Sequence, residues 1–186
     1  MKKIQFILSL TVIVIMGWIW ASHAYAAPFA NITVTVTIQS VSVNLSGTTW
    51  AIGAIAAGQD LQMSETSDIT VTNNGNVPES FTLRLSDPPG WTAGGTAGSE
   101  TYVMKGLLAG TTDAPAGGDF GSEDVITAAS QTATTGIFGY AGPSGANGAS
   151  VAPGNSVDLW LHFSAPTSTS VTTQQSIVVT VGASVP

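Results

Sequence analysis

Cysteine is absent from this chain of 186 residues, and histidine is almost absent. Without thiols the chain can form no disulfide, so its core or its neighbours must hold the fold together. The same absence excludes a lipid anchor on an N-terminal cysteine. His162 is the one histidine after residue 26, and no nucleophile or orienting group stands out around it. Thiol and Ser-His-Asp catalysis are therefore not expected, and the sequence indicates neither an enzyme nor a cofactor.

Charge is also scarce, since only 8% of the residues are Asp, Glu, Lys or Arg. If Lys2 and Lys3 belong to a leader that is removed, only Arg84 and Lys105 face the 11 acidic residues, and the net charge becomes −9. A chain this acidic offers no electrostatic footprint for nucleic acid or anionic lipid. A surface made of Ser, Thr, Gly, Asn and Ala suits a protein that packs against others outside the cell.

The longest apolar run lies at the N-terminus, where Lys2 and Lys3 precede residues 4–21. Residues 24–26 (Ala-Tyr-Ala) fit the small-x-small cleavage pattern, so we expect a signal peptide over 1–26, cleaved after Ala26, with Ala24 as the second choice. An uncleaved membrane anchor is the alternative, because the run approaches the length of a spanning helix. The alanine-rich exit favours cleavage. The expected product is secreted or held at the cell surface, without further membrane contact.

Short β-branched and apolar runs separated by turn signals follow the leader. Alternating residues indicate half-buried strands at 68–72, 81–86, 157–163 and 176–181, and an Asn-Gly cluster at 73–76 predicts a hairpin. Weaker patterns indicate strands at 50–57, 102–108 and 137–138, with a loop at 110–121. Residues 123–135 fit a strand or a short helix, and we favour the strand. No repeat and no long helical period occurs. Residues 41–186 are therefore predicted to form an all-β, antiparallel two-sheet sandwich, Ig-like or jelly-roll-like, preceded by an extended N-terminal strand.

The N-terminal run, residues 31–38, is the most regular pattern in the chain. Four β-branched apolar residues share one parity in it: Ile32, Val34, Val36 and Ile38. The next apolar residues, Val41, Val43 and Leu45, have the opposite parity, so a bulge or a strand boundary is expected near Gln39. We assign residues 27–40 to an extended segment distinct from the sandwich.

Two interpretations of the N-terminal run stay open. It is either the first strand of its own sandwich or a donor strand that completes the sheet of a neighbouring copy. An uncharged β-branched strand on an exposed edge would otherwise promote aggregation. As a donor, Ile32, Val34, Val36 and Ile38 would be the subunit contacts, and head-to-tail contacts of this kind propagate a filament.

Tryptophans support a second function, a monomeric extracellular binding module that contacts a glycan or another adhesive target. Trp91 and Trp160 are the candidates for exposed aromatic contacts, whereas Trp50 is expected in the core. Acidic residues at 119–124, with Asp113 nearby, offer oxygen ligands for calcium but lack the full spacing of a known calcium loop. We therefore favour a solvated acidic loop and expect no metal site.

The pattern of residues 31–38, 50–53, 69–76 and 81–83 resembles that of secreted bacterial Ig-like β-sandwich domains, and residues 153–166 and 177–181 are similar to their closing hairpin. More loosely, the chain resembles camelysin-type biofilm-matrix fibre subunits and archaeal thread filaments. The resemblance covers about 28–86 and 151–182, and residues 92–150 match no family. It implies a homopolymer in which the N-terminal strand of each subunit inserts into the next.

Overall fold

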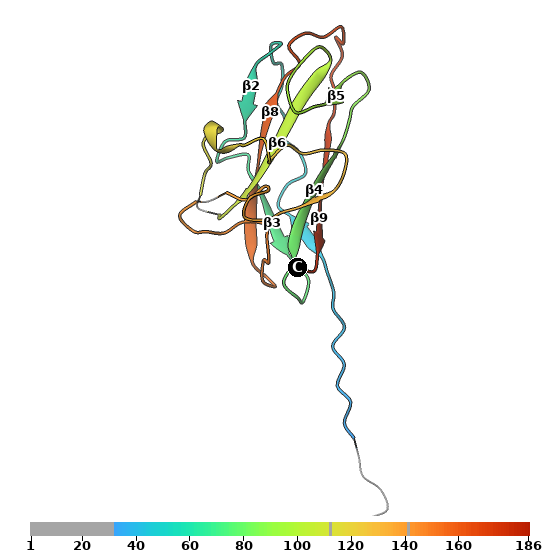
Figure 1. Ribbon diagram of the computed structural model, residues 1–186, viewed down its shortest axis with the longest axis vertical. Coiled ribbons are helices and arrows are strands. Elements are labelled where there is room, and N and C mark those ends of the chain that lie inside the picture. Colours follow the sequence, from blue (N-terminus) through green and yellow to red (C-terminus); the bar gives the residue numbers. More distant parts are fainter. Residues whose placement is uncertain (1–31, 112, 141) are drawn as a thin grey trace, which may run out of the picture. The chain divides into compact units, whose positions relative to one another are not determined.

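The computed structural model describes residues 32–111, 113–140 and 142–186 (Figure 1). The chain divides into two units, Met1–Thr37 and Ile38–Pro186. The predicted signal peptide at 1–26 and residues 27–31 of the predicted donor segment lie outside the described residues.

The predicted all-β class is confirmed, because the described residues form strands and one short 3-10 helix. The elements, in chain order, are β1 (Val43–Leu45), β2 (Asp60–Gln62), β3 (Ile69–Asn73), β4 (Ser80–Ser86), β5 (Thr92–Ala93), β6 (Thr101–Ala109), η1 (Gly117–Asp119), β7 (Gln131–Thr132), β8 (Ser156–Ser164) and β9 (Val178–Ser184).

Two sheets face each other. The larger sheet has the order β1-β3-β8-β6-β5, and β2 pairs with the part of β8 that β3 does not reach. The smaller sheet has the order β7-β4-β9, with β4 and β9 side by side in Figure 1. Every strand pair is antiparallel except β5 with β6, which is parallel. The two-sheet sandwich predicted from the alternating runs is therefore confirmed.

The core lies between the sheets and follows the predicted parity. Phe81, Leu83 and Leu85 of β4 are buried, whereas Arg84 and Ser86 are exposed. The alternate residues of β8 are buried against them: Val157, Leu159, Leu161 and Phe163. Alternation of apolar and polar residues is a reliable signal here because one face of each strand meets the opposite sheet.

The Asn-Gly cluster does not form the predicted hairpin. β3 lies in the larger sheet and β4 in the smaller sheet, so residues 74–79 form an arch between sheets. Asn73 is fully buried, and its Nδ2 donates to the carbonyl oxygens of Val77 and Val151, each at 2.8 Å. These long-range bonds hold the turn open between the sheets, which a local turn rule does not anticipate.

Several weakly patterned segments are irregular rather than strands. The strand predicted at 50–57 is absent, although Trp50 packs partly buried against the core, as expected. Of residues 123–135, only β7 is a strand, and residues 137–138 belong to no named strand. Residues 124–126 and 138–140 instead make short pairings with β6, where Leu108 N donates to Phe138 O at 2.7 Å. One further bond reaches β4, where Leu85 N donates to Thr127 O at 2.9 Å.

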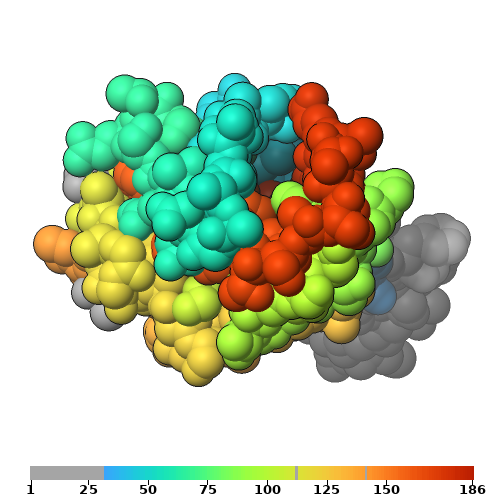
Figure 2. All heavy atoms as spheres, turned by 90° about the horizontal axis from the view of Figure 1, so that it is seen from above, coloured from blue at the N-terminus to red at the C-terminus, as the bar shows by residue number. Residues whose placement is uncertain are grey.

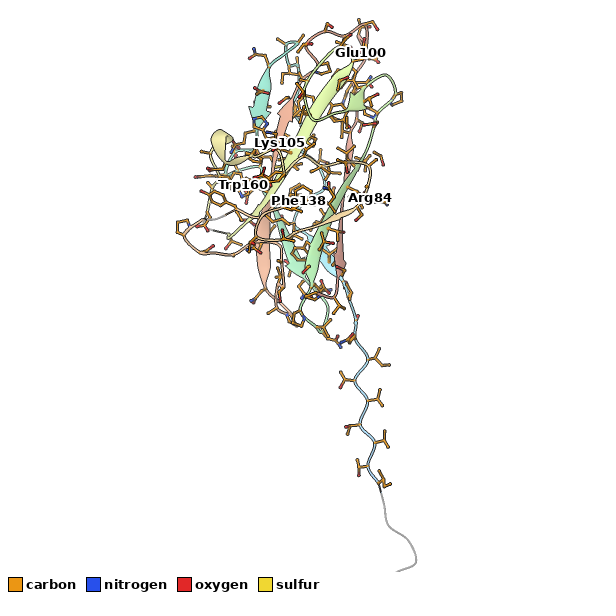
Figure 3. All side chains as sticks on the ribbon, viewed as in Figure 1. Arg84, Glu100, Lys105, Phe138 and Trp160 are labelled. Carbon is orange, nitrogen blue, oxygen red and sulfur yellow. The ribbon has the colours of Figure 1, made fainter. Side chains whose placement is uncertain are left out.

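Residues 113–120 lie over the outer face of the larger sheet, whereas residues 124–126 pair with the edge of β6. Lys105 Nζ on β6 donates to Phe120 O at 2.9 Å, and Gln62 Nε2 donates to Pro115 O at 2.6 Å. Trp160 lies beneath this cover, and Figure 3 places it with Lys105 near η1. The expected loop at 110–121 therefore serves as a third layer over the sandwich.

Candidate functional site

The N-terminal run carries its apolar side chains in solvent. Its described residues, 32–38, belong to no strand. The exposed fractions are 88%, 78%, 80% and 81% for Ile32, Val34, Val36 and Ile38. Four large β-branched side chains of one parity are thus unburied in the single chain.

The arch at residues 74–79 fixes the point where the sandwich unit begins. Asn76 Nδ2 donates to Ile38 O at 2.8 Å, and Asn76 Oδ1 accepts from Ser40 N at 2.8 Å. Asn76 N donates to Ser40 O at 3.1 Å. The side chain and backbone of Asn76 therefore pair with residues 38–40 as a neighbouring strand would, although residues 38–42 have no strand assignment.

Glu79 completes this attachment from inside the protein. The residue is fully buried, and its Oε1 accepts from Ser42 N at 2.7 Å. A Cβ atom at Gly75 would collide with Glu79 Oε1 and with Ser40 O, so glycine is required for the arch to approach this closely. We call residues 38–42, held by Asn76 and Glu79, the root of the N-terminal run. The sequence analysis missed both holding residues.

The smaller sheet ends in an open edge at β9. β9 pairs with β4 over its whole length, from Val178 opposite Ser86 to Ser184 opposite Ser80. Among the described residues, no strand pairs with the other edge of β9. The core-facing side chains along this edge are only partly buried: Ile177, Val179, Val181 and Ala183.

Across from this edge lies β1, which contacts β9 from the larger sheet. Val43 and Leu45 of β1 also pack only partly buried against the core. Seen from above, the surface is hollowed between the cyan segment and the red C-terminal segment (Figure 2). We call this partly exposed apolar line between β1 and β9 the seam.

The aromatic candidates do not form a sugar-stacking surface. The expectation that Trp160 is exposed is wrong, because its side chain is only 4% exposed and belongs to the buried hydrophobic cluster. Trp91 is half-buried against Tyr102 and Phe163, with ring centroids 6.4 and 6.3 Å away. Its indole Nε1 donates to Thr169 Oγ1 at 2.9 Å. The structure therefore separates the two tryptophans and uses both for packing.

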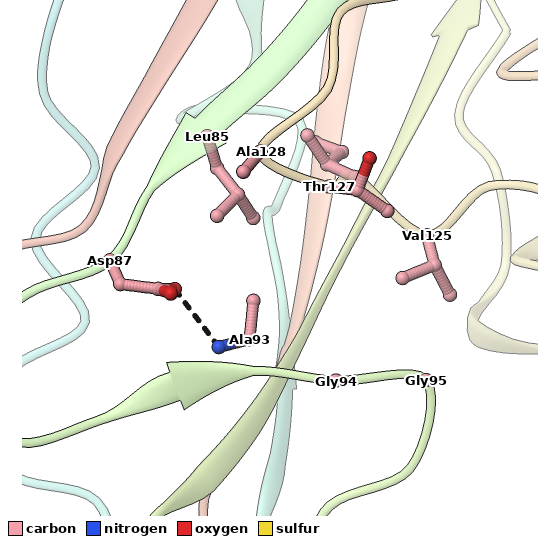
Figure 4. Close-up of a pocket in the computed structure, with 9 residues that line it drawn as sticks. Leu85, Asp87, Ala93, Gly94, Gly95, Val125, Thr127 and Ala128 are labelled. Carbon is pink, nitrogen blue, oxygen red and sulfur yellow. Dashed lines mark hydrogen bonds between the residues drawn. The ribbon is translucent and has the colours of Figure 1, made fainter.

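A shallow pocket of about 240 Å³ lies where β4, β5 and residues 125–128 meet (Figure 4). The carboxylate at its border is already occupied by its own chain, since Asp87 Oδ1 accepts from Ala93 N at 2.9 Å and from Tyr102 Oη at 2.8 Å. Burial and this hydrogen bond raise the pKa of Tyr102. The pocket therefore presents a mostly apolar wall, and one oxygen of its only carboxylate already accepts two hydrogen bonds from the protein.

The acidic loop is not simply solvated. Asp124 is buried, where its Oδ1 accepts from Phe138 N at 2.9 Å and its Oδ2 from Gly121 N at 2.7 Å. Burial raises the pKa of Asp124 despite these hydrogen bonds. Asp119 Oδ2 accepts from Ala116 N at 2.7 Å next to η1. Over the described ranges, no group of three His, Asp or Glu residues is arranged to hold a metal ion.

Two further titratable groups of the larger sheet, His162 and Asp158, have pKa values shifted mainly by burial. His162 lies half-buried with its ring 5.3 Å from Phe120, and burial lowers its pKa. Burial raises the pKa of Asp158, and the neighbouring Asp68 carboxylate acts in the same direction. Neither group borders the pocket, so these pKa shifts reflect packing and mark no reaction centre.

The part of the chain with described coordinates contains no helix long and apolar enough to cross a bilayer. Comparison with known proteins adds no identification, since neither a protein-family model nor a curated protein matches the chain. The candidate site is therefore defined by structure alone: an exposed N-terminal run, its root and the open seam.

Proposed function

We propose that this protein is a secreted structural subunit that polymerises into an extracellular filament by donor-strand complementation. The N-terminal run of one copy completes the sheet of the next, after the signal peptide is removed. The observation that carries the proposal is the exposure of Ile32, Val34, Val36 and Ile38, each at least 78%, on a segment that pairs with none of the described strands of its own chain.

The energetics favour burial of this run in a partner. Each Val or Ile side chain contributes about 1.5–3 kcal/mol when it moves from water into an apolar site. Four such side chains together contribute about 6–12 kcal/mol, which exceeds the lower part of the range of about 4–15 kcal/mol that association costs, and the main-chain hydrogen bonds add to it. Main-chain hydrogen bonds along the added strand set its register.

The root supports the same function by fixing where the run leaves the sandwich. Asn76 and Glu79 bind the backbone of residues 38–42, so the exposed run begins at a defined point. A defined starting point lowers the ordering cost when the run docks. Because the donor and its acceptor are different surfaces of one chain, the contact does not close and the assembly grows.

The alternative of a monomeric glycan-binding module has less support. It depended on Trp91 and Trp160 as exposed contacts, and Trp160 is buried while Trp91 is engaged with Thr169. In the proposed filament the subunit does no chemistry and needs no cofactor, and its contact residues act by packing and hydrogen bonding.

Electron microscopy of the secreted protein, purified from cells that express the full chain, tests the proposal. Filaments are expected for the natural sequence, and deletion of residues 27–38 is expected to leave soluble single subunits. A natural protein that remains monomeric at high concentration would contradict the proposal.

A matched pair of variants separates burial of the run from its mere presence. V34T/V36T keeps β-branching and size but places two hydroxyls on the apolar side, at a cost of roughly 1–3 kcal/mol for each unpaired hydroxyl. T33V/T35V makes the reverse change on the other side. We expect V34T/V36T to lose filaments and T33V/T35V to keep them, as measured by sedimentation.

A further inference from the structure

We infer that the acceptor is the free edge of β9, which takes residues 32–38 of a second copy as an antiparallel fourth strand of the smaller sheet, with Thr35 opposite Thr180. This inference rests on the proposed function, which names the donor strand, and it adds the acceptor strand. The inserted strand would lie in the seam beside β1.

The composition of β9 singles out this edge. Proteins protect free edges with charges, prolines, bulges or very short strands. β9 is seven residues long, and Val178–Ser184 contains no charged residue and no proline. The other edge strands, β1, β2, β5 and β7, have only three, three, two and two residues. β9 therefore lacks the usual protection against pairing with another strand.

Parity gives the register of the pairing. Directly opposed residues of antiparallel strands point to the same face, so the apolar residues of the run must oppose the core-facing residues of β9. One register matches all four: Ile32 with Ala183, Val34 with Val181, Val36 with Val179, and Ile38 with Ile177. A shift by two residues in either direction leaves one of the four without its partner.

The same register pairs the residues of the other face. Thr35 meets Thr180, Thr37 meets Val178, and Thr33 meets Gly182. Cross-strand threonine pairs are favourable, and neither strand brings a charge that would oppose the contact. All seven residues of the run thus face a residue of 177–183.

Strand directions agree with a polar, head-to-tail stack. β1 runs antiparallel to β3, the arch reverses the chain into β4, and β9 runs antiparallel to β4. β1 therefore runs opposite to β9. If copies stack in one orientation and the run continues the direction of its own β1, it meets the next β9 antiparallel.

The ends also match. Ile38 is bound at the arch end of its own copy through Asn76. Ile177 precedes Val178, which pairs with Ser86 at the end of β4 far from the arch. In a head-to-tail stack, the arch end of one copy meets the opposite end of the next, which brings Ile38 to Ile177.

Disulfide trapping tests the register, because the chain has no cysteine of its own. Full-length chains carrying T35C and T180C are expressed separately, secreted, mixed under assembly conditions and oxidised. A non-reducing gel then reports links between copies. Each single variant alone measures the background of identical copies linking to each other.

Arg84→Cys provides the matched control, since Arg84 lies opposite Thr180 on the next strand of the same face and is exposed. A donor on the free edge of β9 would be two strands away from Arg84, about 9.6 Å, beyond the reach of a disulfide. We expect T35C to link to T180C at least about tenfold more than to R84C, and more than T33C or T37C does, because diagonal neighbours are farther apart.

Distinct outcomes separate the two proposals. Filaments that form without a T180C link, or that link equally to R84C, overturn the acceptor and leave donor-strand assembly standing. Absence of filaments from the natural protein overturns the proposed function. A T35C/T180C double variant that closes within single chains, with no links between copies, overturns exchange between subunits.

Discussion

The two edges of the three-stranded sheet are treated in opposite ways. On the β4 side, three separate segments pair with the strand, at Thr127, β7 and Gly148, and Val151 pairs with Glu79 just before it. On the β9 side, no described strand pairs with seven uncharged residues. The difference shows that the chain has the means to close an edge and uses them on one side alone.

The covering segments come from the part of the sequence with the weakest pattern. Residues 110–151 supply the cap over the larger sheet and the pieces along β4. Their function is to remove polar backbone and apolar surface from water at those two places. Among the described residues, the free edge of β9 therefore contrasts with the covered β4 side of the same sheet.

The largest expected effect tests whether the irregular segment at residues 137–138 belongs to the core. Phe138 is fully buried, so Phe138→Ala should lower the free energy of unfolding by about 3–5 kcal/mol in urea titrations. The neighbouring half-buried Ile137→Ala should lose less. A loss below about 1 kcal/mol for Phe138→Ala would mean that this segment is only loosely attached.

A direct comparison of the two sides comes from Leu83 and Val181, which lie opposite each other on β4 and β9. Leu83→Ala should destabilise the single subunit by about 2–5 kcal/mol, because Leu83 is fully buried. Val181 is partly exposed, so Val181→Ala should cost the subunit only about 1 kcal/mol.

Assembly should respond differently from stability. Val181→Ala should weaken filament formation more than it weakens folding of the subunit. The weaker assembly should appear as a higher critical concentration in sedimentation. A Val181→Ala protein with unchanged critical concentration would indicate that the seam is not an interface.

The carboxylate of Asp124 is buried and holds the irregular segments around Gly121 and Phe138 together. Asp124→Ala leaves the backbone N–H groups of Gly121 and Phe138 without their acceptor, and the expected loss is about 2 kcal/mol. Glu123→Ala, next to it and exposed, should change stability by less than about 0.5 kcal/mol. Equal effects of the two substitutions, in the same urea titration, would contradict this role.

The smallest expected effect concerns pH. Burial, and then Asp68, raises the pKa of Asp158 in the folded state, so the folded protein holds this proton more tightly than the unfolded chain. Its contribution to stability is therefore full below about pH 4 and declines as the pH rises through the folded-state pKa. Asp158→Asn should melt at a higher temperature than the natural protein at pH 7 and at a similar temperature at pH 3. Glu65→Gln, at an exposed position, serves as the control. An Asp158→Asn protein whose melting temperature does not rise at pH 7 would contradict a raised pKa of Asp158.

Strands whose two faces differ were predictable. Residues 81–86 alternate because one face meets the opposite sheet, and their burial follows that alternation. In residues 157–163 the predicted core positions are buried, but Asp158 and Trp160 of the other parity are buried as well. The burial of Trp160 was not predictable from its strand, because residues near Phe120, distant in sequence and without a regular period, pack over that face of the sheet.

The candidate site was predictable only in part. The apolar parity of the N-terminal run is visible in the sequence, but its root is not, because Asn76 and Glu79 act through residues about 37 positions away. The free edge of β9 was also hidden. Its sequence reads as an ordinary closing strand, and whether a strand is central or at an edge depends on the arrangement of all the others.

The root has a mechanical consequence for the proposed filament. Tension between subunits would pass from the inserted strand through residues 38–42 into the arch, where bonds to Asn76 and Glu79 share the load. Hydrogen bonds that are loaded at the same time share the pulling force. Bonds that are peeled from one end break one after another. Because the chain has no cysteine and can form no disulfide, the breaking strength of a fibre built from it would depend on the hydrogen bonds of the root.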